Sequence, residues 1–357
     1  MRPSRALRVP VLIVPVLGLL AAPAVAAWQQ RTAPSARAGF AFVSPNGAVD
    51  SFTSYDSAGG TIMVGHPITG VYDVTFGGLG FPAGDVQLTP VNIGAACSVA
   101  TWHPDASGAL DVQVICYDAA GALSDQTFEV LVTQPRARPN GVLDYSWVYR
   151  LNGKLTNRWS YNSSHKVNSV KHLAKGKYLV TMPGPGLTGA SKGTVKVTPY
   201  GGGGGGCQIA AWHTTKTGEQ VTVVCFKASG AARDRNFNIV YARGNNLMGQ
   251  NGKTTANAYA NGGAALYQPK IQFDSNRHAR VTVVHLDRGQ YEVVLVGSSP
   301  GNFPGGFGNV QVTPVAGALR SCGASPNATH TPVVFIECFD AAGKDADTAF
   351  TVQWVVG

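Results

Sequence analysis

The chain has 357 residues, including 44 glycines and 21 prolines, and charged residues make up only 13% of it. This composition, with no long segment of 3.6-residue hydrophobic periodicity, excludes a helical domain and indicates short strands joined by turns. We therefore expect an all-β protein, and its formal net charge of +9 makes acidic partners candidates.

Residues 1–26 predict a secretory signal peptide. Three arginines in the first eight residues precede an apolar run interrupted by proline and glycine, which ends at the small-residue site Ala24-Val25-Ala26. A membrane-spanning helix would need about 20 uninterrupted apolar residues, and no later segment offers them. We expect a secreted, extracellular protein with no membrane span.

Three stretches of the remaining chain share one ordered set of markers. Each contains G-x-Y-x-V, starting at Gly70, Gly176 and Gly289, then V-x-[LV]-T-P, a cysteine, and V-x-[VI]-x-C-[FY]. Each closes with an aspartate and, three residues later, a phenylalanine: Asp125 and Phe128, Asp234 and Phe237, Asp347 and Phe350. The marker glycines are 106 and 113 residues apart, which is the size of a domain rather than of a solenoid unit.

The repeats predict three tandem domains, at 40–134, 140–243 and 258–357. The segment PRARP at 135–139 marks the first boundary, because its two prolines hold it extended. The polar segment 245–257 marks the second boundary.

The markers lie on alternating patterns that are typical of strands with one buried face. Tyr72, Val74 and Phe76 point one way, while Asp73 and Thr75 point the other. About seven or eight such runs in each copy predict a β-sandwich or jelly roll.

The six cysteines follow the same pattern. The first copy has a hairpin with a turn at 105–108, and its centre lies midway between Cys97 and Cys116, so these residues should face each other. The repeats predict the disulfides Cys97–Cys116, Cys207–Cys225 and Cys322–Cys338. Free or zinc-binding thiols are the alternative, which export and the lack of ligand-spaced histidines disfavour. We expect no metal or other cofactor.

Six consecutive glycines, Gly201 to Gly206, precede Cys207. They occupy a loop of five or six residues that every copy has, without the helix or GK[ST] motif of a phosphate-binding loop. We interpret them as an unconstrained surface loop.

Trp102-His103 and Trp212-His213 lie in register five residues after their cysteines. Strand alternation places Trp102 on the face opposite Cys97, so a core or edge-packing role is the favoured interpretation. An exposed tryptophan that stacks on sugar rings is the alternative. No nucleophile or paired-carboxylate motif accompanies the histidines, so we do not expect catalysis.

Asp118 and Asp340 begin D-A-A-G segments that resemble calcium loops. The middle copy has Lys227 at this position but keeps the turn, so we interpret the carboxylates as turn formers. A weak calcium site in the first and third copies is the alternative.

Charge distinguishes the copies most strongly. Residues 28–134 contain 2 basic and 9 acidic residues, 135–244 contain 16 and 3, and 245–357 contain 7 and 7. Aromatic residues alternate with the basic residues in the middle copy, which suits polyanions. The candidate binding residues are Trp147, Tyr149, Arg150, Lys154, Arg158, Lys166, Lys171, Lys175, Lys177 and Trp212.

These features predict a non-enzymatic secreted protein that binds an extracellular polymer through its middle copy. The ligand classes are acidic polysaccharides, cell-wall polymers or other polyanions, with nucleic acid only as a non-specific polyanion. One alternative is self-association of like chains, with the acidic first copy on the basic second copy. An enzyme is the third possibility, and it would need a pocket of clustered titratable groups.

The markers G-x-Y-x-V, C-x4-W, V-x-V-x-C-[FY] and D-x-x-F resemble those of uncharacterised secreted bacterial β-repeat proteins. The resemblance covers most of residues 40–357 and implies repeated β domains but no particular activity. The third copy departs from it because it lacks the tryptophan.

Overall fold

The computed structural model describes residues 37–91, 94, 96–134, 142–151, 154–184, 193–244, 247–248, 254–263, 265–274, 280–295, 308–326 and 333–357. Residues Ala36–Gly357 form one compact unit. The predicted signal peptide and the predicted linker at 135–139 lie outside the described residues.

Repeat 1 begins the fold with the four-stranded sheet β2-β1-β8-β5 and with the antiparallel strands β3-β4-β7-β6, which form half of an eight-stranded sheet. A single 3-10 turn, η1 (Ser51–Thr53), follows its first strand. Its strands are β1 (Arg37–Val43), β2 (Tyr55–Asp56), β3 (Ile62–Ile68), β4 (Val71–Phe76), β5 (Asp85–Pro90), β6 (Ala96–Pro104), β7 (Leu110–Tyr117) and β8 (Phe128–Gln134).

Repeat 2 has the same strand order. Its strands β10-β9-β16-β13 complete the eight-stranded sheet through a parallel pairing of β13 with β6, and β11-β12-β15-β14 form half of a second eight-stranded sheet. Its strands are β9 (Val142–Leu151), β10 (Lys154–Asn162), β11 (Ser169–Ala174), β12 (Lys177–Pro183), β13 (Gly193–Tyr200), β14 (Cys207–Thr215), β15 (Gly218–Cys225) and β16 (Asn236–Arg243).

Repeat 3 completes this second sheet with β22-β25-β17-β19, in which β22 pairs in parallel with β14, and forms the five-stranded sheet β18-β20-β21-β24-β23. Its strands are β17 (Thr254–Ala260), β18 (Leu266–Tyr267), β19 (Gln272–Asp274), β20 (Val281–Asp287), β21 (Gln290–Leu295), β22 (Asn309–Val315), β23 (Arg320–Pro326), β24 (Val333–Asp340) and β25 (Ala349–Val356). The prediction of an all-β chain of three sandwich repeats is confirmed.

Each sandwich has its own apolar core between its two sheets, and the G-x-Y-x-V and D-x-x-F markers supply large parts of it. Tyr72, Tyr178 and Tyr291 are fully buried, and each meets the closing phenylalanine of its repeat edge-on. Such edge-to-face pairs contribute about 0.5–1.5 kcal/mol beyond the buried area.

The three predicted disulfides, Cys97–Cys116, Cys207–Cys225 and Cys322–Cys338, are confirmed. In each repeat the two cysteines are direct partners across an antiparallel hairpin, as the turn positions predicted.

The predicted orientation of Trp102 is wrong. A β-bulge between Val99 and Thr101 inserts one extra residue into β6, so the alternation changes face after Cys97. Trp102 and Cys97 therefore lie in the same core, and β14 has the same irregularity before Trp212.

The segment 245–257 is not simply a polar linker. Its Leu247 and Met248 are fully buried in an apolar cluster that includes Phe40 of repeat 1 and Tyr145 of repeat 2. Residues from Thr254 onward belong to β17. The prediction that each repeat is a domain of its own stays a prediction.

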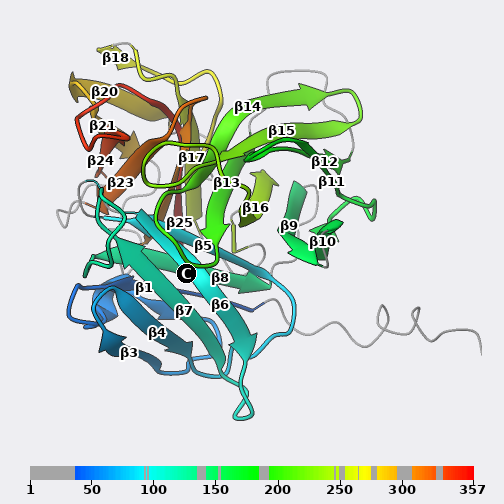
Figure 1. The fold of residues 1–357 in the computed structure, drawn as a ribbon, viewed down its shortest axis with the longest axis vertical. Coiled ribbons are helices and arrows are strands. Elements are labelled where there is room, and N and C mark those ends of the chain that lie inside the picture. Colours follow the sequence, from blue (N-terminus) through cyan, green and yellow to red (C-terminus); the bar gives the residue numbers. More distant parts are fainter. Residues whose placement is uncertain are drawn as a thin grey trace, which may run out of the picture. The chain divides into compact units, whose positions relative to one another are not determined.

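The three sandwiches pack around a common axis through the sheets that contain β5, β13 and β22. On these strands the side chains that point away from the core of their own repeat are buried as well. In Figure 1 the repeats follow the colours from blue to red, and β13 contacts both β5 and β25 between them. On β5 the core residues Val86 and Leu88 alternate with Gln87 and Thr89, yet all four are buried. The polar residues of these strands therefore face another repeat and not water.

A cyclic set of hydrogen bonds joins the repeats at the threonine of V-x-[LV]-T-P. Thr198 accepts from the Leu88 amide, Thr313 from the Val197 amide, and Thr89 from the Val312 amide, at 3.0–3.1 Å. Each repeat thus bonds the preceding one, and repeat 1 closes the ring on repeat 3. Such bonds satisfy backbone groups that would otherwise be buried without partners.

The closing strand of each repeat, β8, β16 or β25, takes part in a second cyclic set of hydrogen bonds. Asn238 donates to the Val86 carbonyl and Thr351 to the Val195 carbonyl, while Glu129 accepts from the Val310 amide. The three side chains occupy the same place in their repeats, immediately after the closing phenylalanine. The equivalent contacts show that the chain is built as a pseudo-threefold ring.

Lys196 interrupts the symmetry of this ring. Thr198 donates to Gln87 and Thr89 donates to Gln311, but the third member of the set is a lysine, Lys196. Lys196 is 1% exposed and its side-chain nitrogen instead donates to Thr351 at 3.2 Å.

Candidate polymer-binding surface and seam cavities

Half of the candidate binding residues predicted from sequence lie in β9 and β10. The structure describes the backbone of these strands, but the side chains of Trp147, Tyr149, Arg150, Lys154 and Arg158 lie outside the described residues. The other candidates are described in full.

Four predicted lysines, Lys166, Lys171, Lys175 and Lys177, are exposed around the β11–β12 hairpin. Strand β11 is the edge of its sheet, so its outward side chains face solvent. None of the four pairs with a carboxylate among the residues that the structure describes. Their positive charges are therefore free to meet an anionic partner.

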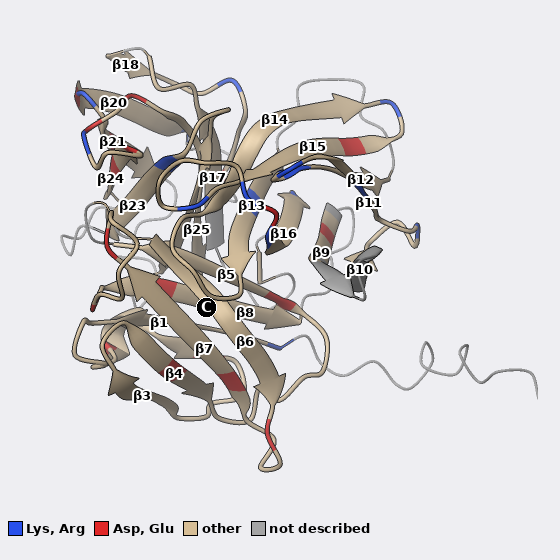
Figure 2. Cartoon of the chain, in the orientation of Figure 1, with Lys and Arg blue, Asp and Glu red and all other residues tan. Residues whose placement is uncertain are grey.

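The sign of the charge on this sheet face is particular to repeat 2. On the same outer face, repeat 1 presents Asp73 and Asp111, and repeat 3 presents Glu292 and Glu337, all exposed or half-buried. Figure 2 shows basic residues around β11, β12 and the tip of the β14–β15 hairpin, and further ones around β20, β21 and β23, with acidic residues on β4 and β7. The hairpin tip adds exposed Lys216.

Trp212 is a half-buried residue that packs on the core of repeat 2. Its ring lies edge-on to Tyr241, and its indole nitrogen donates to Glu219 at 2.7 Å. Only part of the ring is left for a ligand, and that part lines a cavity at the boundary with repeat 3.

The residue after T-P determines how each boundary between repeats, here called a seam, is filled. At the seam between repeats 1 and 2, Tyr200 packs on the core of repeat 1, and its hydroxyl is hydrogen-bonded to Thr101 and to the Trp102 backbone. The equivalent residues are Val91 and Val315, which are too short to reach so far.

Cavities lie at both seams that have valine. Val315 lines a cavity of about 470 Å³ between residues 210–214 of β14 and residues Tyr259 and Ile271 of repeat 3. Val91 lines a cavity of about 740 Å³ at the seam between repeats 1 and 3. Both are in the roughly 300–1,000 Å³ range of ligand pockets.

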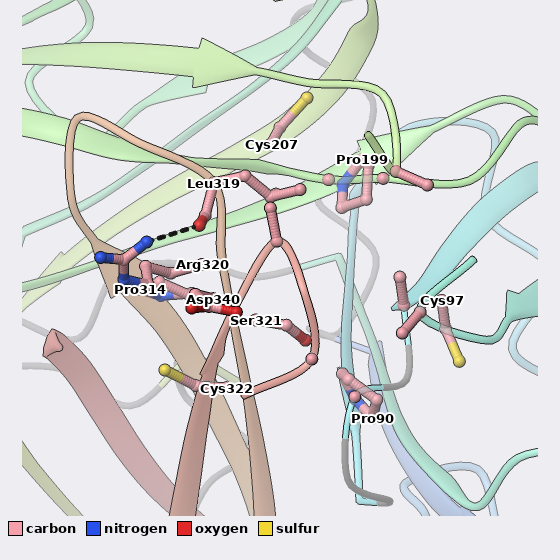
Figure 3. Close-up of a pocket in the computed structure, with 18 of the residues that line it drawn as sticks. Pro90, Cys97, Pro199, Cys207, Pro314, Leu319, Arg320, Ser321, Cys322 and Asp340 are labelled. Carbon is pink, nitrogen blue, oxygen red and sulfur yellow. Dashed lines mark hydrogen bonds between the residues drawn. The ribbon is translucent and has the colours of Figure 1, made fainter. Parts of the chain in front are cut away.

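A third cavity, of about 90 Å³, lies on the pseudo-threefold axis. Figure 3 shows it surrounded by equivalent prolines and cysteines from all three repeats, with Leu319 among them. It has room for a few water molecules rather than for a ligand of ordinary size.

The hexaglycine loop lines this axial cavity, and its interpretation as an unconstrained loop is wrong. A Cβ on Gly205 would lie 2.3 Å from the Phe226 carbonyl oxygen, so no side chain fits there. Buried Arg235 donates to the Gly201 carbonyl at 2.9 Å, and Tyr117 of repeat 1 accepts from the Gly203 amide at 2.6 Å. Gly204 likewise has no room for a side chain beside Gly121 of repeat 1, whereas Gly201 and Gly206 have open space.

The aspartates of the D-A-A-G segments bond their own turns. Asp118 accepts from the Ala122 amide, and Asp340 accepts from the Ala342 and Lys344 amides. The structure thus supports the interpretation of turn formers. Among the described residues, no three His, Cys, Asp or Glu side chains are grouped so as to hold a metal ion.

A histidine that the sequence analysis did not single out joins two of the markers in every repeat. His66, His172 and His285 contact Asp125, Asp234 and Asp347 at 2.7–2.9 Å. The same carboxylate oxygen accepts from the amide of the marker glycine at 2.6–2.8 Å. The pattern H-x3-G-x-Y, present in all three copies, is the signal that identifies this histidine.

These clusters hold the closing loop against the hairpin that contains G-x-Y. The tyrosine hydroxyl accepts from the residue after the aspartate, for example from the Gln126 amide to Tyr72 at 3.0 Å. The hydrogen bond from the Gly70 amide, with His66 nearby, holds the pKa of Asp125 below its usual value. The arrangement stabilises the fold and accounts for the joint repetition of both motifs.

Replacing Asp125 with alanine is expected to lower the free energy of unfolding by about 0.5–1.5 kcal/mol, because the Gly70 amide and His66 lose their partner at a partly exposed site. Since the folded-state pKa is lowered, this contribution is present above the ordinary pKa near 4 and is lost as pH falls further. Urea unfolding at neutral and acid pH measures it. Asp73→Ala, which removes one exposed contact to Gln113, is the control, and an equal cost in both variants would contradict the role.

No helix in the described part of the chain has the length and apolar character needed to cross a membrane. Comparison with protein-family models, with curated proteins and with solved structures finds no match for this chain.

Proposed function

We propose that the chain is an exported, non-enzymatic protein that binds an extracellular anionic polymer through the exposed lysines of repeat 2. The three disulfides are consistent with an oxidising compartment outside the cell, as the N-terminal sequence predicts. The partner is a polyanion, with acidic polysaccharide as the first candidate.

The observation that carries the proposal is the reversal of charge on one equivalent face. The three repeats share a fold, yet the outer face of this sheet carries Lys171 and Lys177 in repeat 2, without a carboxylate partner among the described residues, and carboxylates such as Asp73 and Glu292 in repeats 1 and 3. A scaffold that only needed solubility has no reason to separate the two signs. A group of like charges attracts a polyelectrolyte because binding releases its counterions.

The internal contacts favour an external partner over pairing of the charges within the chain. Among the described residues the ion pairs are the three His–Asp pairs, each inside one repeat. The bonds between repeats 1 and 2 come instead from neutral side chains such as Thr198 and Asn238. The lysines are therefore not consumed by the acidic repeat of the same chain.

Changing Lys166, Lys171, Lys175 and Lys177 together to serine is expected to weaken binding of inorganic polyphosphate and of hyaluronan by more than about tenfold at low salt. The fold should be unaffected, because all four side chains are exposed. Titration of the full exported chain with each polymer measures the affinity.

The matched control changes four exposed cations of repeat 3, Lys270, Arg280, Arg288 and Lys344, to serine. This control alters the net charge by the same amount, so unchanged polymer binding by the control would show that the loss depends on the position of the repeat 2 lysines and not on net charge. Equal losses in both variants, or none in the first, would contradict the proposal. Salt-sensitive oligomers without polymer, abolished by the repeat 2 changes, would instead support self-association.

A further inference from the structure

The cavity at the seam between repeats 2 and 3 has the lining of a site for a polar ring. Trp212 and Tyr259 contribute aromatic surface, Ile271 and Val315 contribute apolar surface, and His213 and Thr214 contribute polar groups. Ligand sites combine such apolar walls with a few polar groups that fix orientation.

Two of its polar groups have no side-chain hydrogen bond within the described part of the chain. The Tyr259 hydroxyl is half-buried and the His213 ring is exposed, and neither forms a side-chain hydrogen bond with any residue that the structure describes. Each is left available to a bound hydroxyl or carbonyl group.

The charge at this cavity excludes a phosphate group as its occupant. None of its described lining residues is Lys or Arg. The carboxylate of Glu219 lies directly behind Trp212 and Thr214, from which it accepts hydrogen bonds at 2.7 and 2.9 Å. An uncharged ring with hydroxyl groups suits both the aromatic faces and the free polar groups.

We propose that this cavity binds one sugar ring of the polymer that the lysines attract. The inference rests on the proposed function and narrows its ligand from any polyanion to a polysaccharide. The cavity lies along β14 and the lysines lie around β11, three strands away in the same sheet. Strands are about 4.8 Å apart, so the two features are separated by about 14 Å, which a few linked sugar units span.

The seam between repeats 1 and 2, which Tyr200 fills, suggests a substitution that would fill the proposed sugar site. Changing Val315 to tyrosine places at this seam the residue that occupies the first one, where Tyr200 lies against Thr101 and Trp102. The variant should keep its melting temperature and bind hyaluronan about tenfold more weakly. Its binding of inorganic polyphosphate should be unchanged, because the lysines are untouched.

Changing Val91 to tyrosine is the matched control, because it alters the seam between repeats 1 and 3 with the same substitution. It should leave both affinities unchanged. If V315Y melts at a lower temperature, the variant with both Tyr259→Phe and His213→Ala decides, since it removes the free polar groups and keeps the aromatic wall. That variant should also bind hyaluronan more weakly, while its binding of polyphosphate should be unchanged.

Undiminished hyaluronan binding by the altered cavity would overturn the assignment. The oligonucleotide dT20 tests the other ring-bearing polymer, and a loss as large as that for hyaluronan would assign the cavity to a nucleobase and also overturn it. If the proposed function is wrong, the four-lysine variant will bind the polymers as well as the unmodified chain does. If only this inference is wrong, the four-lysine variant will lose affinity but the seam variants will not.

Discussion

For the Glu129→Gln variant, the free energy of unfolding relative to that of the unmodified chain should increase by about 3 kcal/mol as the pH rises from 5 to 7. Glu129 is fully buried between repeats 1 and 3, where one of its oxygens accepts from the Val310 amide. Burial raises the pKa of this carboxyl to about 8.

The direction of the effect follows from proton binding. A carboxyl with a raised pKa holds its proton in the folded state at pH values where the unfolded chain has released it. Its contribution to stability is complete below the ordinary pKa near 4.5 and is lost as pH rises toward 8, at about 1.4 kcal/mol per pH unit. Glutamine does not titrate, so this part of the slope disappears.

Urea unfolding at pH 5, 6 and 7 measures the change in slope. Asp85 provides a second variant, since burial raises its pKa to about 7 and repeat 3 has Asn309 at the same position. Asp85→Asn should remove a further part of the slope, and the two changes should add. Identical pH dependence in E129Q and the unmodified chain would contradict a buried carboxyl at this seam.

Changing Lys196 to glutamine should stabilise the ring. Glutamine is the residue of the other two repeats, where Gln87 and Gln311 accept from threonine. It would allow Thr313 to donate in the same way and complete the set, at about 1 kcal/mol for the hydrogen bond. It would also remove a buried amine.

The pH dependence of K196Q has the opposite sign to that of E129Q. Burial holds the pKa of Lys196 well below its ordinary value, so the unfolded chain binds a proton that the folded chain does not. Stability is therefore lost as pH falls from about 10 toward the lowered folded-state pKa, and the advantage of K196Q should grow as pH falls through that range.

Thermal and urea unfolding between pH 7 and pH 10 compare the two proteins. Lys171→Gln, an exposed change of the same type on β11, is the control and should have little effect. A K196Q protein that is less stable than the unmodified chain would show that the ring needs the lysine.

The repeated markers were sufficient to predict the sandwich class and the disulfides. Alternation identifies the core face of each strand, and a hairpin with a recognisable turn fixes which cysteines are opposite. The sheet face on which Trp102 lies was predicted wrongly, because the β-bulge between Val99 and Thr101 cannot be recognised from the alternation of apolar and polar residues.

The ring of repeats could not be predicted from the same pattern. Alternation separates the two faces of β5, but Gln87 and Thr89 look like residues of a solvent-facing surface. Only the contacts with Thr198 and Gln311 show that this face is buried. The hexaglycine was misinterpreted because the residues that constrain it, Gly121 and Tyr117 of repeat 1 and Phe226 of repeat 2, meet it only in the folded chain.

For the candidate site, sequence located the basic repeat and the lysines of the β11–β12 hairpin. It did not locate the seam cavity, because Val315 is unremarkable until it is compared with Tyr200 in the assembled ring. The positions of neighbouring repeats determine which side chains meet there, and no local pattern encodes them.

The salt dependence of polyphosphate binding tests the central claim most directly. Four lysine contacts give a slope of log affinity against log salt concentration of about −3 by the single-strand coefficient. The unmodified chain should be steeper by about 3 than the variant with serine at Lys166, Lys171, Lys175 and Lys177. Parallel lines for the two proteins would contradict binding through this surface.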